Sequence, residues 1–159
     1  MGAAAALLGA SLFVAGCGNS NSSPAASTPS TTATTAPAAA NSISTATGAD
    51  GTYLVGPSGK ALYLFEADKN GKSACSGACA STWPPLVVTT TPTTSGGASS
   101  ADLGTITLSD GSKQLTYNGH PLYYFAGDSG PGMTTGQGSD TFGALWWLVS
   151  TSGSAITKG

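Results

Sequence analysis

One aromatic phrase occurs twice in this chain, and it constrains the fold more than any other feature. The first copy reads ALYLFEAD at residues 61–68, and the second reads PLYYFAGD at residues 121–128. In an extended segment, the alternation places Tyr and Phe on one face and the remaining apolar residues on the other. Because both faces are apolar, each copy is expected to be a strand that is covered on both sides. Two copies are too few for a stacked solenoid, so we predict two halves that complete a single shared core.

Turn signals between aromatic and β-branched runs favour hairpins over helices. Gly56-Pro57-Ser58-Gly59 separates two such runs in the first half, and an Asp110-Gly111 pair separates two in the second. No long stretch after residue 48 has a 3.6-residue period, so little helix is expected. Strands are expected at residues 52–56, 60–66, 83–88, 104–108, 114–117, 121–126 and 144–150. The pattern predicts an all-β fold, a small antiparallel sandwich or barrel built from two pseudo-repeats.

The N-terminal residues have the pattern of an export signal. Residues 3–15 form an uncharged apolar run that is too short to span a membrane, and Gly16-Cys17 follow it. The ending VAGC resembles the lipobox of bacterial lipoproteins, in which the cysteine becomes the new N-terminus and carries the lipid. We therefore expect a lipoprotein signal peptide at residues 1–16 and lipidation of Cys17. The alternative is an ordinary signal peptide followed by an incidental cysteine. The lipoprotein pattern has a Lys or Arg before the apolar run, and this chain departs from it because none is present.

The composition changes after Cys17. Residues 18–48 carry no charge and almost no large apolar side chain, so they cannot bury enough surface to offset the entropy of ordering. We therefore expect the lipidated cysteine and a disordered Ser/Thr/Ala/Pro tether at residues 17–48. The remaining segments are expected to be a β domain at 49–152, with repeats at about 52–88 and 103–150, a Thr/Ser/Gly linker at 89–101, and a tail at 153–159.

Sparse charge limits the partners of the chain. Only 8% of the 159 residues are charged, Arg is absent, and the formal net charge is −2. Binding to nucleic acid requires a dense basic surface that neutralises phosphates, and this composition excludes it. The expected partners are a membrane, reached through the lipid anchor, and an envelope component or small ligand.

Cys75 and Cys79 are the other two cysteines, and three kinds of site suit them. An even pair outside the cytoplasm first predicts a disulfide, which the small residues between them allow to close. A redox-active pair is the second interpretation, with Lys72 as the only cation near in sequence. The third is a copper site, in which His120 and Met133 would complete a soft ligand set.

The chain offers few residues for catalysis. His120 is the only histidine, so a catalytic triad has a single candidate base, and no Gly-x-Ser-x-Gly motif is present. The sequence does not give the distances between carboxylates in space, so any two of four could pair as acid and base. These four are Glu66, Asp68, Asp128 and Asp140. We assign no catalytic residue, expect no cofactor apart from the copper alternative, and do not favour an enzyme.

The tyrosines and phenylalanines of the repeated phrase have two interpretations. In the first, they belong to the core, and each terminal Asp ends its strand by accepting turn amides. In the second, a partly exposed aromatic surface binds a sugar or another planar ligand, with Trp83, Trp146 and Trp147 as candidates. Aligning Gly59 with Gly119 makes Trp83 correspond loosely to Trp147.

These motifs closely resemble a family of predicted bacterial lipoproteins with a conserved Y-x-[FWY]-x-x-D motif, the secreted repeat of unknown function. The motif falls on Tyr63, Phe65 and Asp68, and again on Tyr123, Phe125 and Asp128. The resemblance covers about residues 50–150, and the lipobox and tether agree with it. It implies a surface lipoprotein and carries no established activity.

Together these features predict a lipid-anchored, extracytoplasmic lipoprotein of unknown molecular activity at the bacterial cell membrane or envelope. Its expected role is a non-enzymatic binding or cell-envelope module. The alternative is a redox or copper-handling protein that uses the Cys75/Cys79 pair.

Overall fold

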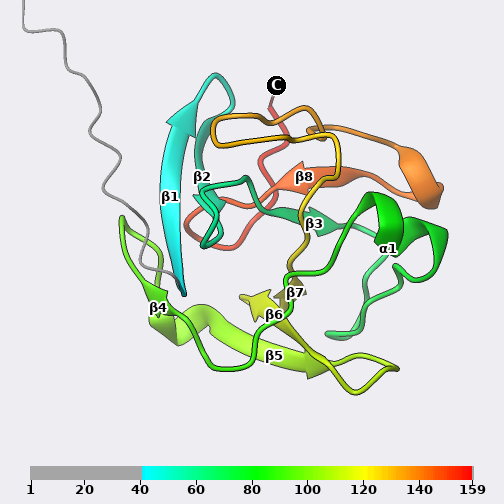
Figure 1. Cartoon of the computed structure of the whole chain (residues 1–159). Helices are drawn as coiled ribbons and strands as arrows, with labels where there is room; N and C mark the ends of the chain where they lie inside the picture. Colours follow the sequence, from blue (N-terminus) through cyan, green and yellow to red (C-terminus); the bar gives the residue numbers. More distant parts are fainter. Residues whose placement is uncertain (1–40, 159) are drawn as a thin grey trace, which may run out of the picture. The chain divides into compact units, whose positions relative to one another are not determined.

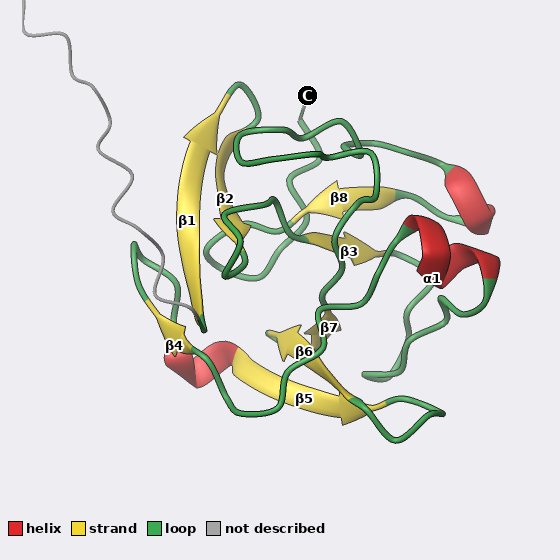
Figure 2. Cartoon of the chain, viewed as in Figure 1, coloured by secondary structure: helices red, strands yellow, loops and turns green. Residues whose placement is uncertain are grey.

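A computed structural model describes residues 41–158, and within this range the chain is built from short strands (Figure 1). The strands are β1 (Ser42–Gly48), β2 (Gly51–Val55), β3 (Tyr63–Phe65), β4 (Thr93–Thr94), β5 (Leu103–Thr107), β6 (Lys113–Tyr117), β7 (His120–Pro121) and β8 (Trp146–Leu148). The helical segments are α1 (Ala78–Thr82), η1 (Ser100–Asp102) and η2 (Thr141–Gly143). Figure 2 shows how little of this part is helical, so the predicted all-β class is confirmed. Within residues 41–158, no helix has the length and apolar character that crossing a membrane requires.

The strands form three small sheets, with the orders β2–β1–β4, β3–β8 and β5–β6–β7. Neighbouring strands are antiparallel, except that β4 runs parallel to β1. β3 and β8 lie far apart in the sequence, as their different colours in Figure 1 show, yet they pair directly. In this pair Tyr63 lies opposite Leu148, and Phe65 lies opposite Trp146. The β3–β8 ladder therefore joins the two halves of the chain.

The hairpin predicted in the second half is present, whereas the turn predicted in the first half closes through a single bridge between Val55 and Ala61. In the second half β5 and β6 are antiparallel, and Leu108 N–H donates to Ser112 O at 2.9 Å across the turn. Gly111 has a φ of 86°, a left-handed conformation that glycine adopts without a steric penalty. In the first half Gly56 N–H donates to Lys60 O at 3.0 Å.

Two of the expected strands are reduced to isolated bridges. Residues 83–88 pair only through single bridges, of Pro85 with Tyr123 and of Val87 with Gln114. Pro84 and Pro85 have no N–H to donate, so this segment cannot continue a regular ladder. The expected strand at 121–126 likewise becomes the short β7 and a set of bridges.

Strand β1 was not predicted, because residues 42–48 were assigned to the tether. The segment reads SISTATG, yet residues 44–48 pair with β2, residues 42–43 pair with β4, and Ile43 is fully buried. Backbone pairing and the burial of Ser42 and Ile43 order this polar segment, so the tether prediction is wrong for residues 42–48. The predicted linker similarly contains β4, and in the predicted tail Ile156 N–H donates to Leu148 O at 2.9 Å. The signal peptide, Cys17 and the tether as far as residue 40 lie outside the described residues.

The alternation in the repeated phrase correctly predicted which side chains share a face, but the core is not single. Tyr63 and Phe65 enter one buried cluster, which is rich in aromatic rings. Leu62 and Leu64 enter a second cluster, which is mostly aliphatic. Strand β3 is therefore covered on both faces, and the two clusters replace the single shared core that was expected.

Candidate functional site

The two copies of the aromatic phrase meet at their tyrosines. Tyr63 N–H donates to Tyr123 O at 2.9 Å, and Tyr123 N–H donates to Tyr63 O at 3.0 Å. This mutual exchange is the hydrogen-bonded pair of an antiparallel ladder, and it relates the two residues by an approximate two-fold axis. The side chains next to this pair of tyrosines are therefore expected to make matching contacts in the two copies.

Each tyrosine binds the aspartate of the other copy. The Tyr63 hydroxyl donates to Asp128 Oδ2 at 2.6 Å, and the Tyr123 hydroxyl lies 2.8 Å from Asp68 Oδ2. We call these two contacts the crossed Tyr–Asp pairs. They answer why the phrase is needed twice, because each copy supplies the acceptor that the buried hydroxyl of the other copy requires.

The second carboxylate oxygen of each aspartate holds a turn. Asp68 Oδ1 accepts the Ala74 amide at 2.7 Å, and Asp128 Oδ1 accepts the Thr135 amide at 2.9 Å and the Thr135 hydroxyl at 2.6 Å. These contacts match the turn role expected from the sequence. The bonds to tyrosine could not be predicted, since they join residues more than fifty positions apart.

Four aromatic rings form a stack between the two crossed pairs, in the order Phe65, Trp146, Trp83 and Phe125. The ring centroids are 4.0 Å apart for Phe65–Trp146, 3.9 Å for Trp83–Trp146 and 4.5 Å for Trp83–Phe125. Tyr63 contacts Trp83 edge-on at 5.3 Å, and Tyr123 contacts Trp146 edge-on at 5.1 Å. We call these four rings the aromatic stack. It obeys the same two-fold relation as the crossed pairs.

This geometry corrects two predictions about tryptophan. The counterpart of Trp83 is Trp146 and not Trp147, since Trp83 and Trp146 make equivalent contacts. Trp83 and Trp146 are both fully buried, so they cannot form the predicted aromatic binding surface. Trp147 is partly exposed on the opposite face of β8, and its Nε1 donates to Glu66 Oε1 at 2.8 Å.

Cys75 and Cys79 form a disulfide, with their Cα atoms 5.2 Å apart. Gly77 between them has a φ of 57°, a left-handed conformation that lets this short loop turn into α1. Because the two sulfurs are bonded to each other, the copper alternative with thiolate ligands is contradicted. Among the described residues, no group of three or more His, Cys, Asp or Glu side chains could hold a metal ion.

The redox-active interpretation of the cysteines stays a prediction, and burial disfavours it. Cys75 is 7% exposed and Cys79 is 6% exposed, whereas thiol–disulfide exchange requires access to a sulfur atom. Of the other two residues in the copper alternative, Met133 accepts a hydrogen bond from the Ser129 hydroxyl at 3.1 Å, and His120 lies in β7.

Removing the disulfide is expected to lower the free energy of unfolding by up to about 2 kcal/mol, the chain-entropy value for so short a loop. The test is urea unfolding of a Cys75→Ser/Cys79→Ser variant, compared with the wild type with and without reductant. Reduced wild type should match the variant. Equal midpoints for all three samples would contradict a stabilising disulfide.

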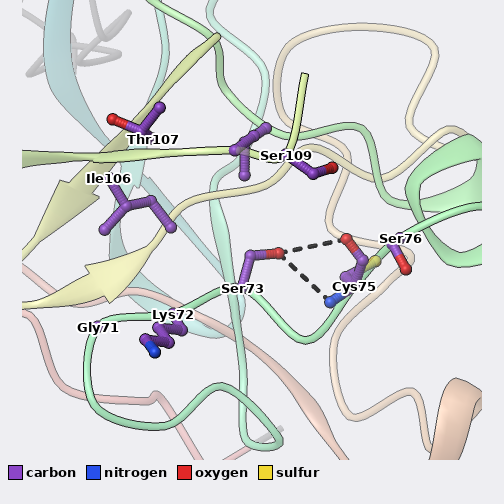
Figure 3. Close-up of a pocket in the computed structure, with 9 residues that line it drawn as sticks. Gly71, Lys72, Ser73, Cys75, Ser76, Ile106, Thr107 and Ser109 are labelled. Carbon is purple, nitrogen blue, oxygen red and sulfur yellow. Dashed lines mark hydrogen bonds between the residues drawn. The ribbon is translucent and has the colours of Figure 1, made fainter. Parts of the chain in front are cut away.

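Two surface hollows flank the crossed pair of Tyr123 and Asp68. The first, of about 410 Å³, lies between the disulfide loop and the end of β5 (Figure 3). Its lining residues are Gly71, Lys72, Ser73, Cys75, Ser76, Ile106, Thr107, Leu108 and Ser109. The second, of about 440 Å³, is lined by Leu64, Phe65, Glu66, Asp68, Lys69, His120, Ala144 and Ala155. The predicted candidates Asp68 and His120 are thus brought together, whereas Met133 lines neither hollow.

The hydroxyl of Tyr123 contacts one lining residue of each hollow. Its hydroxyl lies 2.8 Å from Asp68 Oδ2, in the second hollow, and 2.7 Å from Ser73 Oγ, in the first. Figure 3 shows Ser73 in turn bonded to the backbone of Cys75, whose N–H donates to Ser73 Oγ at 3.3 Å. Ser73 was not among the predicted site residues, since a lone serine in a turn gives no sequence signal.

Burial raises the pKa of Asp68 above its ordinary value of 3.8. The Ala74 amide, the Tyr123 hydroxyl and the charges of His120 and Lys69 lower the pKa, but they do not cancel the effect of burial. The folded state therefore binds more protons than the unfolded state at pH values just above 3.8. It follows that the contribution of Asp68 to stability is fully present below pH 3.8 and is lost as the pH rises through the folded pKa.

We therefore expect the stability of the wild type relative to an Asp68→Asn variant to fall as the pH rises from 3.8. The measurement is urea unfolding of both proteins over a series of pH values. Asp110→Asn is the control, because hydrogen bonds from Ser112 lower the pKa of Asp110 and reverse the sign. There the stability of the wild type relative to the variant should fall as the pH drops. If stability changed with pH in the same direction for both variants, the opposite pKa shifts of Asp68 and Asp110 would be contradicted.

Comparison with known families gives one result. The model of the secreted repeat of unknown function matches twice, over residues 44–87 and 104–150, which together make up more than half of the chain. No curated protein and no solved structure matches the chain. Each matched segment contributes one tyrosine and one aspartate to the crossed Tyr–Asp pairs.

Proposed function

The chain belongs, through both of its repeats, to the family of secreted repeats of unknown function. We propose that it is a lipid-anchored, extracytoplasmic module of the cell envelope that acts by binding and not by catalysis. One observation supports the binding role: the Tyr and Asp side chains that the two copies have in common form hydrogen bonds with each other. The repetition therefore serves the fold, and recognition is left to the surface.

The anchor is supported by sequence and by redox chemistry. The apolar run at residues 3–15 ends in the small residues and the cysteine that lipid transfer requires. The Cys75–Cys79 disulfide is typical of an oxidising compartment outside the cytoplasm. Cys17 is then the only cysteine that remains for the lipid, and the uncharged residues after it have the composition of a tether.

The binding role is supported by the two hollows. Their volumes of about 410 and 440 Å³ lie within the range of small-ligand sites. The first offers the hydroxyls of Ser73, Ser76 and Ser109 and the charge of Lys72. The second combines Glu66, Lys69 and His120 with an apolar floor. These linings suit a small polar ligand or a polar segment of an envelope component.

The anchor is tested by feeding a bacterial host that expresses the full chain with an alkyne-tagged fatty acid. Wild-type protein should carry the tag and sediment with membranes, whereas Cys17→Ala should be untagged and appear in the soluble fraction. The matched control is Cys75→Ser/Cys79→Ser, which removes two cysteines and should keep the tag. A tagged Cys17→Ala protein, or an untagged wild type, would refute the anchor.

A further inference from the structure

We propose that the aromatic stack and the crossed Tyr–Asp pairs form a one-electron relay, which takes an oxidising equivalent from an oxidant at the surface and stores it on Tyr63. The proposal goes beyond the binding role, and it depends on neither the lipid anchor nor the cysteines. It rests on three features of the geometry: the stacked indoles, the absence of a base on their N–H groups, and the carboxylate on each tyrosine.

The first feature is the indole pair. Trp83 and Trp146 stack with centroids 3.9 Å apart and planes 2° from parallel, and Phe65 extends the stack at 4.0 Å. Overlapping indoles share the positive charge of a radical cation, so the pair loses an electron more readily than an isolated tryptophan. Both rings are fully buried, which keeps water from reacting with the cation.

The second feature is the acceptor of each indole N–H. Trp83 Nε1 donates to Thr141 Oγ1 at 3.2 Å, and Trp146 Nε1 donates to Thr141 O at 2.9 Å. A hydroxyl and a peptide carbonyl are weak bases, so the oxidised indole keeps its proton and remains a strong oxidant. The contrast is Trp147, whose Nε1 donates to the Glu66 carboxylate. An oxidising equivalent on the stack therefore has to leave by electron transfer from a neighbour.

The third feature identifies that neighbour. Tyr63 contacts Trp83 edge-on at 5.3 Å, and its hydroxyl donates to Asp128 Oδ2 at 2.6 Å. Phenol oxidation makes the hydroxyl proton strongly acidic, and this carboxylate is in position to take it. Burial, and then the hydrogen bond to Asp128, raises the pKa of the Tyr63 phenol, so the proton is present at neutral pH. The Gly136 N–H, 3.4 Å from the phenol oxygen, can still donate to that oxygen after the proton has left.

The steps balance as follows. A one-electron oxidant, such as a peroxyl radical or an oxidised metal complex, takes one electron from the Trp83–Trp146 pair and leaves a radical cation. Tyr63 passes one electron to that cation, its O–H bond breaks, and the proton moves to Asp128 Oδ2. The products are neutral tryptophan, a neutral tyrosyl radical and a protonated Asp128. A one-electron reductant such as ascorbate resets the relay, and the proton returns from Asp128 to Tyr63.

The two ends of the relay differ in exposure. Tyr123 has the same edge-on contact, at 5.1 Å from Trp146, and the same kind of carboxylate partner in Asp68. However, Asp68 lines a surface hollow, whereas Asp128 is 1% exposed. Both tyrosines are fully buried, so the difference lies at their carboxylate partners. A reductant in the hollow can approach Asp68, which is hydrogen-bonded to Tyr123, and a radical on Tyr123 therefore decays first. Tyr63 is the end at which the radical persists.

The test is photochemical oxidation of the full chain by a ruthenium polypyridyl complex with a sacrificial electron acceptor. Transient absorption and electron paramagnetic resonance distinguish tyrosyl from tryptophan radicals. We expect a long-lived neutral tyrosyl radical in the wild type and its loss in Tyr63→Phe. The matched control is Tyr117→Phe: Tyr117 is fully buried, but its hydroxyl pairs with Thr151 O and the Ser99 amide and with no carboxylate.

A second variant separates proton transfer from packing. Asp128→Asn keeps the size of the side chain, and its amide oxygen can accept from Tyr63 while the contact with Thr135 is lost. An amide is, however, too weak a base to take the proton. The long-lived tyrosyl signal should then be lost and a tryptophan radical should replace it, with near-ultraviolet circular dichroism like that of the wild type. The relay is overturned if the wild type forms no tyrosyl radical. It is also overturned if Asp128→Asn forms that radical normally, or if Tyr117→Phe loses as much signal as Tyr63→Phe.

Discussion

Replacing Trp83 with alanine is expected to lower the free energy of unfolding by about 3–5 kcal/mol, the range for a buried tryptophan truncated in a rigid core. Trp83 is fully buried and touches three rings, at centroid distances of 3.9 Å to Trp146, 4.5 Å to Phe125 and 5.3 Å to Tyr63. The backbone at Gly136 also packs closely against the indole, since a Cβ added at this glycine would lie 2.6 Å from the ring. Neither the rings nor this backbone can relax into the space that Trp83 would leave.

The same two-fold relation provides the controls. Trp146→Ala should cost about as much as Trp83→Ala, because the two indoles make equivalent contacts. Trp147→Ala should cost clearly less, because Trp147 is partly exposed and lies outside the aromatic stack. Guanidinium unfolding followed by far-ultraviolet circular dichroism measures all three without depending on tryptophan emission. Equal losses at Trp83 and Trp147 would show that the stack has no special role in stability.

Local chemistry in the sequence predicted the elements whose causes are local. The Asp110-Gly111 turn gives the β5–β6 hairpin because glycine tolerates a positive φ, and alternation assigns Tyr63 and Leu62 to opposite faces. The Cys75–Cys79 disulfide follows in the same way from a short spacing and a secreted context. Each of these depends on residues close together in the chain.

The features that were missed depend on register between distant segments. Trp146 and Trp147 are neighbours on opposite faces of β8, and only the pairing with β3 decides which one faces Trp83. Strand β1 was overlooked because backbone pairing with β2 keeps this segment ordered, and amino-acid composition carries no information about such pairing. The crossed Tyr–Asp pairs were missed for the same reason, since a terminal Asp fits a turn equally well in either half.

The two-fold relation gives the repeated motif a physical meaning. A buried tyrosine hydroxyl needs an acceptor, and a buried carboxylate needs donors. The crossed arrangement satisfies both only when the second copy is present, so neither half is complete alone. The family match reflects this division, because its two segments each carry one Tyr and one Asp of the crossed pairs. This accounts for the fold without any catalytic role for the motif.

The second large effect is expected for Tyr63→Phe, which should lower the free energy of unfolding by roughly 2–3 kcal/mol, the range for a lost hydrogen bond to a buried charged group. The change removes one oxygen atom and leaves the ring contact with Trp83 in place. Asp128, at 1% exposure, then retains only the amide and hydroxyl of Thr135 as donors. Water cannot readily replace the missing hydroxyl at so buried a carboxylate.

Tyr123→Phe is the matched comparison, because it removes the same atom from the equivalent position. Asp68 is only partly buried and lines a surface hollow, so water can hydrate the carboxylate that the variant leaves behind. We therefore expect a smaller loss there, of about 1 kcal/mol, the ordinary net value of a hydrogen bond. Urea unfolding at neutral pH measures both variants, and a double-mutant cycle of Tyr63→Phe with Asp128→Asn isolates the pairwise energy. If the two tyrosines cost the same, burial of the acceptor does not set the strength of the crossed pairs; if the cycle gives no coupling, the Tyr63–Asp128 bond does not join the halves.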